Sequence, residues 1–196
     1  MKKRTAVLIS GNGSNLQALL DAARAEDFPA TISLVISNKA DAYGITRASN
    51  AGVPVEVLSH RDFSSREAFD EALHKLLIQH RIELVCLAGF MRLLTADFTR
   101  KWEGRMLNIH PSLLPAFKGL NTHARVLESG VKTTGCTVHF VVPEMDAGPV
   151  VLQAEVPVMP GDTPHTLAER VHKEEHRIYP LALARLAGGL LRPQEE

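Results

Sequence analysis

Cysteine is scarce in this sequence, and neither sign of charge is in excess. Only Cys86 and Cys136 occur among the 196 residues, both in apolar runs, and their spacing fits neither a zinc site nor a disulfide scaffold. We therefore expect both thiols to pack as small buried groups. Lysine plus arginine number 22, as do aspartate plus glutamate, so the formal net charge is zero. A broad nucleic-acid surface needs a basic excess, so we expect no nucleic-acid partner, although a local anion site remains open.

Long apolar runs are absent too. The run Thr5–Ile9, after the basic N-terminus, is too short for the apolar part of a signal peptide, and no run approaches the length of a membrane span. We therefore expect a cytoplasmic protein with no membrane partner. A chain of this length buries roughly 70% of its unfolded surface, which predicts one domain whose core needs no disulfide or metal ion.

Strand and helix patterns alternate along the chain. Short apolar runs predict strands at Thr5–Ser10, Thr31–Ser37, Val55–Leu58, Leu84–Ala88, Met106–Ile109, Cys136–Val142 and Val150–Val156. Helices are predicted at Asn15–Ala25, from Asp41 to about Gly52, at Ser65–His80, at His123–Glu128 and from Pro164 onward. The alternation predicts a single α/β domain, a mostly parallel twisted sheet with helices on both faces, and ligands at the carboxyl ends of the strands.

Local signals also predict where helices begin and end. Asp41 is expected to cap the second helix, and Ser64 with Glu67 to form a capping box at the third. Thr163 is expected to cap the last helix, with Pro164 at its first position. Pro180 should kink or interrupt that helix, because proline removes a backbone hydrogen bond.

A glycine-containing loop, Ser10–Asn15, follows the first predicted strand. Glycines let backbone N–H groups approach a ligand closely, and the helix start presents further free N–H groups, a combination that favours a phosphate. Leu16 stands where the dinucleotide fingerprint needs a glycine, Ser37-Asn38 stand where it needs an acid, and the Walker lysine is absent. The loop therefore favours a monophosphate over NAD or ATP; the alternative is a tight turn that binds nothing.

Asn108 and His110 are two residues apart at a predicted strand end, so their side chains point the same way. A histidine exchanges a proton near neutral pH, and an asparagine amide donates to a developing oxyanion. Asp146 lies on an acidic Gly-Pro turn, and if it faces His110 its carboxylate would keep the imidazole protonated as a general acid. The alternatives are a structural hydrogen-bonded pair and a solvated loop acid. His139 is interpreted as structural or supporting.

Three more charged residues are candidates for binding. Glu175 lies in line with the apolar positions of the last helix, where an acid needs a partner or a ligand such as an amine, unless it reaches solvent at the edge of that face. Arg66, in a first helical turn, and Arg92, at a strand end, are each either a surface charge or a group that holds a carboxylate in a cleft.

Five segments taken together resemble the phosphoribosylglycinamide formyltransferase family of folate-dependent enzymes. They span nearly the whole chain in family order: Ile9–Leu16, Ser37–Ala42, Leu87–Arg92, Leu107–Pro115 and Asp146–Val150. The Asn-x-His-Pro-Ser-Leu-Leu-Pro run marks the wider formyltransferase superfamily, and the Ser-Gly-Asn-Gly-Ser-Asn loop points to this member. The resemblance implies one domain with a Rossmann-like formyltransferase fold, comprising a phosphate-binding half (1–100), a catalytic and folate-binding half (101–188) and a loose tail (189–196).

The resemblance also implies a reaction. A formyl group would pass from 10-formyltetrahydrofolate, the co-substrate, to the primary amine of N1-(5-phospho-D-ribosyl)glycinamide in purine biosynthesis. Asn108 and protonated His110 would stabilise the oxyanion and protonate the leaving group, while Asp146 would keep His110 charged and help to remove the amine proton. No covalent nucleophile or metal ion is expected. The partners would be these two small molecules, and the chain would be a monomer or a homodimer.

The family's binding residues are carried over by motif. On the ribonucleotide side they are Gly13, Ser14, Asn15, Leu16, Gln17, His172, Lys173, Glu174 and Glu175. On the folate side they are Arg66, Met91, Arg92, Leu93, Leu94, Asn108, Val142, Pro143, Glu144, Met145 and Asp146. Glu175 would contact the ribose, whereas Lys173 and Glu174 are expected from their helical positions to face water.

Alternatives from the same superfamily and from another class remain. A formyltransferase acting on methionyl-tRNA would normally carry a C-terminal domain and more basic charge, and a formyl-folate hydrolase an N-terminal domain; we expect neither here. A formyltransferase acting on a nucleotide sugar is a further alternative. A non-catalytic nucleotide-binding module would use the glycine loop but has no need of Asn108, His110 and Asp146 together.

Overall fold

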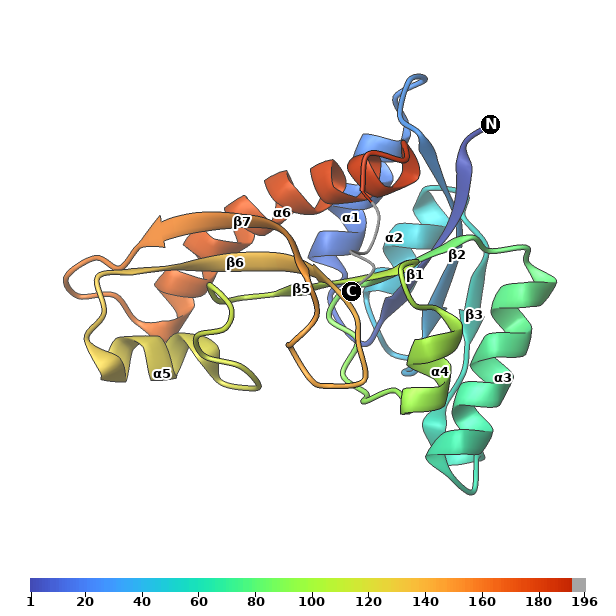
Figure 1. Cartoon of the computed structure of the whole chain (residues 1–196), viewed down its shortest axis with the longest axis horizontal. Helices are drawn as coiled ribbons and strands as arrows, with labels where there is room; N and C mark the ends of the chain where they lie inside the picture. Colours follow the sequence, from blue (N-terminus) through green and yellow to red (C-terminus); the bar gives the residue numbers. More distant parts are fainter. Residues whose placement is uncertain (192–196) are drawn as a thin grey trace.

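A computed structural model describes residues 1–191 as one seven-stranded sheet with helices packed around it (Figure 1). The strands are β1 (Lys3–Ile9), β2 (Ala30–Ser37), β3 (Val55–Val57), β4 (Leu84–Leu87), β5 (Met106–His110), β6 (Thr133–Phe140) and β7 (Val150–Pro157). The helices are α1 (Ser14–Ala23), α2 (Gly44–Asn50), α3 (Arg66–Gln79), α4 (Ala96–Lys101), α5 (Thr122–Ser129) and α6 (Pro164–Ala187), with a 3₁₀ turn, η1, at His60–Asp62. Most of the predicted tail, residues 192–196, lies outside the described part of the chain.

The strand order is β3-β2-β1-β4-β5-β6-β7. All pairings from β3 through β5 are parallel, and β5–β6 and β6–β7 are antiparallel, which confirms the predicted mostly parallel sheet. The chain builds outward from β1 to β3 and then returns to place β4 on the other side of β1. In open sheets such a reversal leaves a crevice at the carboxyl ends of the two central strands, where ligands bind.

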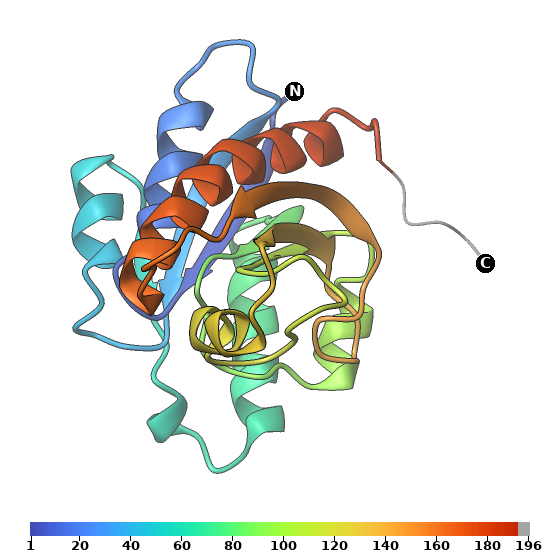
Figure 2. The ribbon, with the colours of Figure 1, turned by 90° about the vertical axis from the view of Figure 1, so that its left-hand side faces the viewer.

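Apolar side chains cover both faces of the sheet, as the continuous apolar runs predict. On β1, Val7 and Ile9 belong to one buried cluster and Ala6 and Leu8 to another. The first cluster packs beneath α1 and α6, which contact each other, and Figure 2 shows α6 crossing in front of α1. The second packs beneath α3 and α4, where Trp102 is fully buried. The core therefore holds the strands, and hence their carboxyl ends, in fixed positions.

Cys86 and Cys136 are both buried and free, which confirms that they pack as small apolar groups. Burial raises the pKa of each thiol to about 12, so neither is a thiolate near neutral pH. Within residues 1–191, no helix is long and apolar enough to cross a membrane.

Two of the predicted helix starts are wrong. Helix α3 is capped by Ser65, whose hydroxyl accepts the N–H of Ala68, and not by Ser64. Helix α2 begins at Gly44 after Tyr43, so Asp41 does not cap it. The short elements α4 and η1 were not predicted, because six and three residues carry too little periodicity to stand out. The capping of α6 by Thr163, with Pro164 at its start, is confirmed.

Of the two outcomes predicted for Pro180, a kink or an interruption, the interruption is wrong. Helix α6 runs without a break from Pro164 to Ala187 and carries Pro180 inside it. Residues on either side of the proline, including Tyr179 and Ala182, are fully buried against the sheet. This tertiary packing outweighs the lost hydrogen bond, and the Tyr179 hydroxyl adds a bond to the Leu87 carbonyl at 2.8 Å.

Candidate active site

A cavity of about 780 Å³ opens at the carboxyl ends of β1, β4 and β5, at the predicted edge of the sheet. Its lining comes from segments far apart in the chain. These are the loop 11–15, the segment 87–94, the strand end 108–111, the segment 119–123, the loop 141–146 and the side chains of Thr99, His139, His172 and Glu175. The cavity thus brings together the glycine loop, Asn108, His110, Asp146 and Glu175, which the sequence analysis selected one by one.

The glycine loop is held open by packing against α2. Gly13 has a φ of 76°, in the left-handed region, and a Cβ there would lie 2.7 Å from the Gly44 Cα, so only glycine fits. The Gly44 N–H donates to the Gly11 carbonyl at 3.0 Å. The Arg47 guanidinium donates to both the carbonyl and the side-chain oxygen of Asn12, at 2.8 and 2.7 Å. The loop is therefore built into a fixed shape.

Helix α1 starts directly from this loop and points its first turn at the cavity. Its N-cap, Gly13, offers no side-chain cap, and its first turn carries no acidic residue. The N–H groups of the first turn, starting at Ser14, are therefore available to a ligand, and the helix dipole adds a partial positive charge. This arrangement suits an anion such as a phosphate.

Asn108 is oriented by the neighbouring antiparallel strand. It pairs directly with His139 of β6, and its Nδ2 lies 3.2 Å from His139 Nε2. His139 Nδ1 donates to the Phe140 carbonyl at 2.9 Å, and burial lowers the pKa of this histidine. Neutral His139 therefore carries its proton on Nδ1 and accepts one Asn108 amide hydrogen at Nε2, which leaves the second amide hydrogen for the cavity. The interpretation of His139 as a supporting residue thus gains a specific contact.

His110 lies between two acceptors. Its Nε2 is 2.9 Å from the Phe117 carbonyl, and its Nδ1 is 3.6 Å from Asp146 Oδ2. The side chains of His110 and Asp146 are only 7% and 9% exposed, so water screens this pair little. Each ring nitrogen of His110 therefore faces an oxygen atom, one from the backbone and one from a carboxylate.

Asp146 is aimed at His110 by an unusual turn. It has a φ of 53°, and its Oδ2 accepts the Gly119 N–H at 2.8 Å. Two residues later, a Cβ on Gly148 would overlap the Phe140 carbonyl oxygen, so the chain can return to β7 on this path only with glycine there. The juxtaposition of Asp146 and His110, expected from the motifs, is present in the structure.

Glu175 is buried and joins α6 to the glycine loop. It is 4% exposed, which excludes the alternative that it reaches solvent. Its Oε2 accepts the Asn15 Nδ2 at 3.1 Å and lies 3.9 Å from His172 Nε2, and burial raises its pKa. Within residues 1–191, Asn15 Oδ1 is buried and has no hydrogen-bond partner, so this end of the cavity keeps a free acceptor.

The mouth of the cavity is apolar. Met91, Leu93, Leu120 and Met145 line it with more than half of each side chain exposed. Arg92 also lines it, with its guanidinium 4.7 Å above the Phe69 ring. An exposed apolar rim beside a polar interior suits a ligand with a flat apolar body.

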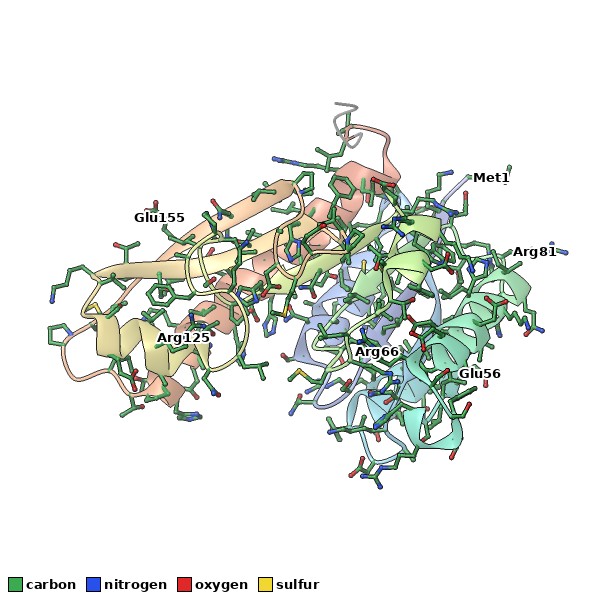
Figure 3. All side chains as sticks on the ribbon, turned by 60° about the horizontal axis from the view of Figure 1, so that its bottom comes forward. Met1, Glu56, Arg66, Arg81, Arg125 and Glu155 are labelled. Atoms are coloured by element: carbon green, nitrogen blue, oxygen red, sulfur yellow. The ribbon has the colours of Figure 1, made fainter. Side chains whose placement is uncertain are left out.

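Several carried-over residues do not line this cavity. Arg66, labelled in Figure 3, donates instead to the Leu93 carbonyl at 3.1 Å, so it supports the segment 87–94 from outside. The Leu16 side chain is fully buried in the core. Gln17, Lys173 and Glu174 also lie outside the lining; Glu174 pairs with Arg177 on the exposed side of α6.

The segment 119–123 was missed by the sequence analysis. It follows a loop braced by Arg125, labelled in Figure 3, whose Nη1 donates to the carbonyls of Lys118 and Leu120 at 2.6 and 3.2 Å. His123 lines the cavity, and burial lowers its pKa. The acceptor on Phe117 and the donor on Gly119 are backbone groups that every residue type carries, so no side-chain pattern marks them.

Comparison with known proteins agrees with this geometry. The formyl transferase family profile matches residues 3–183. A phosphoribosylglycinamide formyltransferase from Escherichia coli (strain K12) is 49% identical over 189 residues, covering 96% of this chain and 89% of that protein. A solved structure of the protein with this name from Brucella melitensis has a TM-score of 0.92 and 49% identity, covering 99% of this chain and all of that one.

Longer relatives match as well. A trifunctional purine biosynthetic protein, adenosine-3, from Bos taurus is 54% identical over 191 residues. That match covers 97% of this chain but 19% of the relative, so the chain spans about a fifth of that protein's length. The profile match over residues 3–183, together with the identity to relatives and structures along nearly the whole chain, shows that this chain belongs to the formyl transferase family.

Proposed function

We propose that this chain transfers the formyl group of 10-formyltetrahydrofolate to the primary amine of N1-(5-phospho-D-ribosyl)glycinamide, a step of purine biosynthesis. The observation that carries the proposal is the convergence of Asn108, His110 and Asp146 in one cavity, between an anion site and an apolar mouth. The names of the whole-length relatives from Escherichia coli and Brucella melitensis support the same activity.

The ribonucleotide would bind at the end of the cavity formed by α1 and α6. Its phosphate would accept hydrogen bonds from the N–H groups of Gly13, Ser14 and Asn15. Leu16 would contribute only through its backbone. Its ribose hydroxyls would donate to Glu175, whose buried carboxylate has limited contact with water, with His172 beside it. Gln17, Lys173 and Glu174 would act only from outside this pocket.

The folate would bind at the other end. Its flat pterin ring would enter between the segment 87–94 and the loop 141–146, with Met91, Leu93 and Met145 against its apolar parts. Leu94 and the loop residues Val142, Pro143 and Glu144 line the same wall. Arg92 offers a cation there, and Arg66 would act from the rim, where it fixes Leu93.

The chemistry follows from the three polar side chains between these ends, Asn108, His110 and Asp146. The substrate amine attacks the formyl carbon, a C–N bond forms, and the carbonyl electrons move onto oxygen. The free amide hydrogen of Asn108 stabilises that oxyanion, together with the imidazolium of His110, whose Nε2–H would exchange the Phe117 carbonyl for the substrate. The amine proton leaves towards Asp146, the bond from carbon to the folate nitrogen breaks, and His110 protonates the departing nitrogen. His110 then regains a proton from Asp146, so the site ends as it began.

Three further features belong to the proposal. We propose a cytoplasmic location, and two functional halves: residues 1–100, which hold the phosphate, and 101–188, which supply the catalytic trio. Because the segment 87–94 lines the proposed folate end of the cavity, the first half also contributes to folate binding. The mechanism uses no metal ion.

The test is a folate absorbance assay with the purified protein and both substrates. We expect product only when both are present. His110→Ala should lower turnover about 100- to 10,000-fold while binding of the ribonucleotide persists. Methionyl-tRNA or a nucleotide sugar serves as the competing acceptor. Turnover with one of these and none with the ribonucleotide would overturn the proposed acceptor, and near-normal turnover by His110→Ala would remove His110 from the mechanism.

A further inference from the structure

One buried hydroxyl joins the two walls of the cavity. Ser10 follows the last residue of β1 and is the first residue of the glycine loop, and it is 5% exposed. Its Oγ accepts the N–H of Met91 at 2.8 Å and donates to Asn38 Oδ1 at 2.6 Å. Met91 belongs to the segment 87–94, which forms the proposed folate wall of the cavity. The residues directly after Ser10, 11–15, form the proposed ribonucleotide wall. A single side chain thus connects segments that are 81 residues apart.

The Ser10–Met91 hydrogen bond lies just beyond the last backbone pair between β1 and β4. Strands β1 and β4 pair in parallel up to Leu8 and Leu87, and the Ala88 N–H still donates to the Leu8 carbonyl at 2.9 Å. Beyond this point the two strands are no longer paired, because β1 leads into the glycine loop and β4 leads into the segment 89–94. The Ser10 side chain then takes the Met91 N–H in place of a backbone carbonyl, which extends the link between the strands past the end of their ladder.

Asn38 sets the direction of this link. It lies directly after β2 and is 4% exposed. A serine hydroxyl has one hydrogen and two lone pairs. Because the Ser10 hydrogen is committed to Asn38 Oδ1, a lone pair of Ser10 Oγ faces the Met91 N–H. The ends of β1 and β2 therefore act together to hold one point of the folate wall.

The far side of the same wall is held more weakly. The Leu93 carbonyl accepts a hydrogen bond from the Arg66 guanidinium. Because this contact is exposed to water, it contributes little to stability. The Ser10 contact is partly buried, where an unmade hydrogen bond costs more. Ser10 is thus the firmer of the two anchors.

We propose that Ser10 is a positioning residue, which holds the segment 89–94 in the correct place relative to the ribonucleotide loop and so tunes folate binding without touching either substrate. The inference rests on the proposed function. It adds to that function a residue whose loss should weaken binding of the folate more than binding of the ribonucleotide. Losing the Ser10 hydroxyl should displace the folate wall, whereas the glycine loop keeps its own supports from Gly44 and Arg47.

The chain offers a matched control in Ser37. It is fully buried at the end of β2, and its hydroxyl donates to the Lys39 carbonyl at 2.7 Å and accepts the Lys39 N–H at 3.1 Å. Ser37→Ala therefore removes a hydroxyl of the same kind, burial and hydrogen-bond number, but one that contacts only its own turn. Any difference from Ser10→Ala isolates the link to Met91.

The kinetic experiment measures both Michaelis constants for wild type, Ser10→Ala and Ser37→Ala. We expect Ser10→Ala to raise KM for 10-formyltetrahydrofolate about five- to tenfold, the effect of one lost net hydrogen bond, and to change KM for the ribonucleotide less than twofold. Ser37→Ala should leave the ratio of the two constants at the wild-type value. An equal rise in both constants, or the same ratio in both variants, would overturn the proposal.

A second experiment needs no substrate. Amide hydrogen exchange of the free protein should show faster exchange at Met91 in Ser10→Ala and unchanged exchange there in Ser37→Ala. Unchanged Met91 exchange in Ser10→Ala would overturn the proposal even if the enzyme is active. Wild-type protein that turns over neither substrate would instead refute the proposed function, and the exchange data would still decide whether Ser10 holds this segment.

Discussion

Asp146→Asn separates the proposed catalytic role of this carboxylate from its structural role. The substitution keeps the shape of the side chain and removes its charge, 3.6 Å from His110 Nδ1. An asparagine oxygen can still accept the Gly119 N–H, which now donates to Asp146 Oδ2 at 2.8 Å. The variant therefore keeps the turn and loses only what the negative charge supplies.

The substitution should affect the activation barrier much more than the free energy of unfolding. Exchanging a charged acceptor for a neutral one weakens a hydrogen bond by about 1 kcal/mol, so the free energy of unfolding should fall by about 1–2 kcal/mol. Proton transfer by a positioned group contributes about 10²- to 10⁴-fold in rate, which corresponds to about 2.7–5.5 kcal/mol in the activation barrier. The loss of activity should therefore far exceed the loss of stability.

The assay combines urea unfolding with kcat and both KM values over a range of pH. We expect kcat to fall about 100-fold or more, because an asparagine cannot take the amine proton and no longer supplies a negative charge beside His110. Glu169→Gln, which removes a 64% exposed carboxylate from α6, is the charge-loss control and should match wild type. A near-normal kcat in Asp146→Asn, or a loss confined to the folate KM, would refute the catalytic role.

Three other substitutions test the anion site and two buried carboxylates. Ser14→Glu puts a like charge at the start of α1 and should raise KM for the ribonucleotide at least about tenfold more than KM for the folate; steady-state kinetics showing an equal rise would contradict the phosphate assignment. Burial raises the pKa of Glu175, which costs stability above the unfolded-state pKa, so Glu175→Gln should unfold at higher urea than wild type at pH 8, with the gain shrinking towards pH 4. A gain that is independent of pH would argue against this cause. Hydrogen bonds from the Arg170 guanidinium hold the pKa of Asp162 well below its usual range, so its contribution is present above about pH 4 and is lost as pH falls. Asp162→Asn should therefore lower the Tm at pH 7 more than at pH 3, and a constant difference would contradict the ion pair.

The fold and the centre of the site could be predicted because they depend on side chains in local patterns. Apolar runs located all seven strands to within a few residues, and the glycine loop followed from its position between a strand and a helix. Asn108, His110 and Asp146 were selected as residue types that carry proton and oxyanion chemistry, and the structure brings them together. Periodicity and residue chemistry are the information that a sequence displays directly.

The remaining features depend on tertiary structure. The sequence predicts a kink or an interruption at Pro180, but the helix continues through it because its neighbours are buried against the sheet. The capping residue of α3 was misplaced by one position, since Ser64 and Ser65 offer the same hydroxyl. The acceptor at Phe117 and the donor at Gly119 could not be predicted, because the path of a loop rather than the identity of a side chain places them.

The pairing of Asn108 with His139 has a consequence for how this enzyme can be altered. Both residues stand on adjacent strands of the sheet, and their contact depends on the β5–β6 register rather than on any loop. The walls that would select the two substrates are loops and a helix end, which tolerate changes in sequence and length far better than a central strand does. An engineer who seeks a new amine acceptor can therefore vary the positions of the loop 11–15 other than Gly13, and the exposed parts of α6, while leaving β5 and β6 untouched. The proposed oxyanion site would then be present unchanged in every member of such a library.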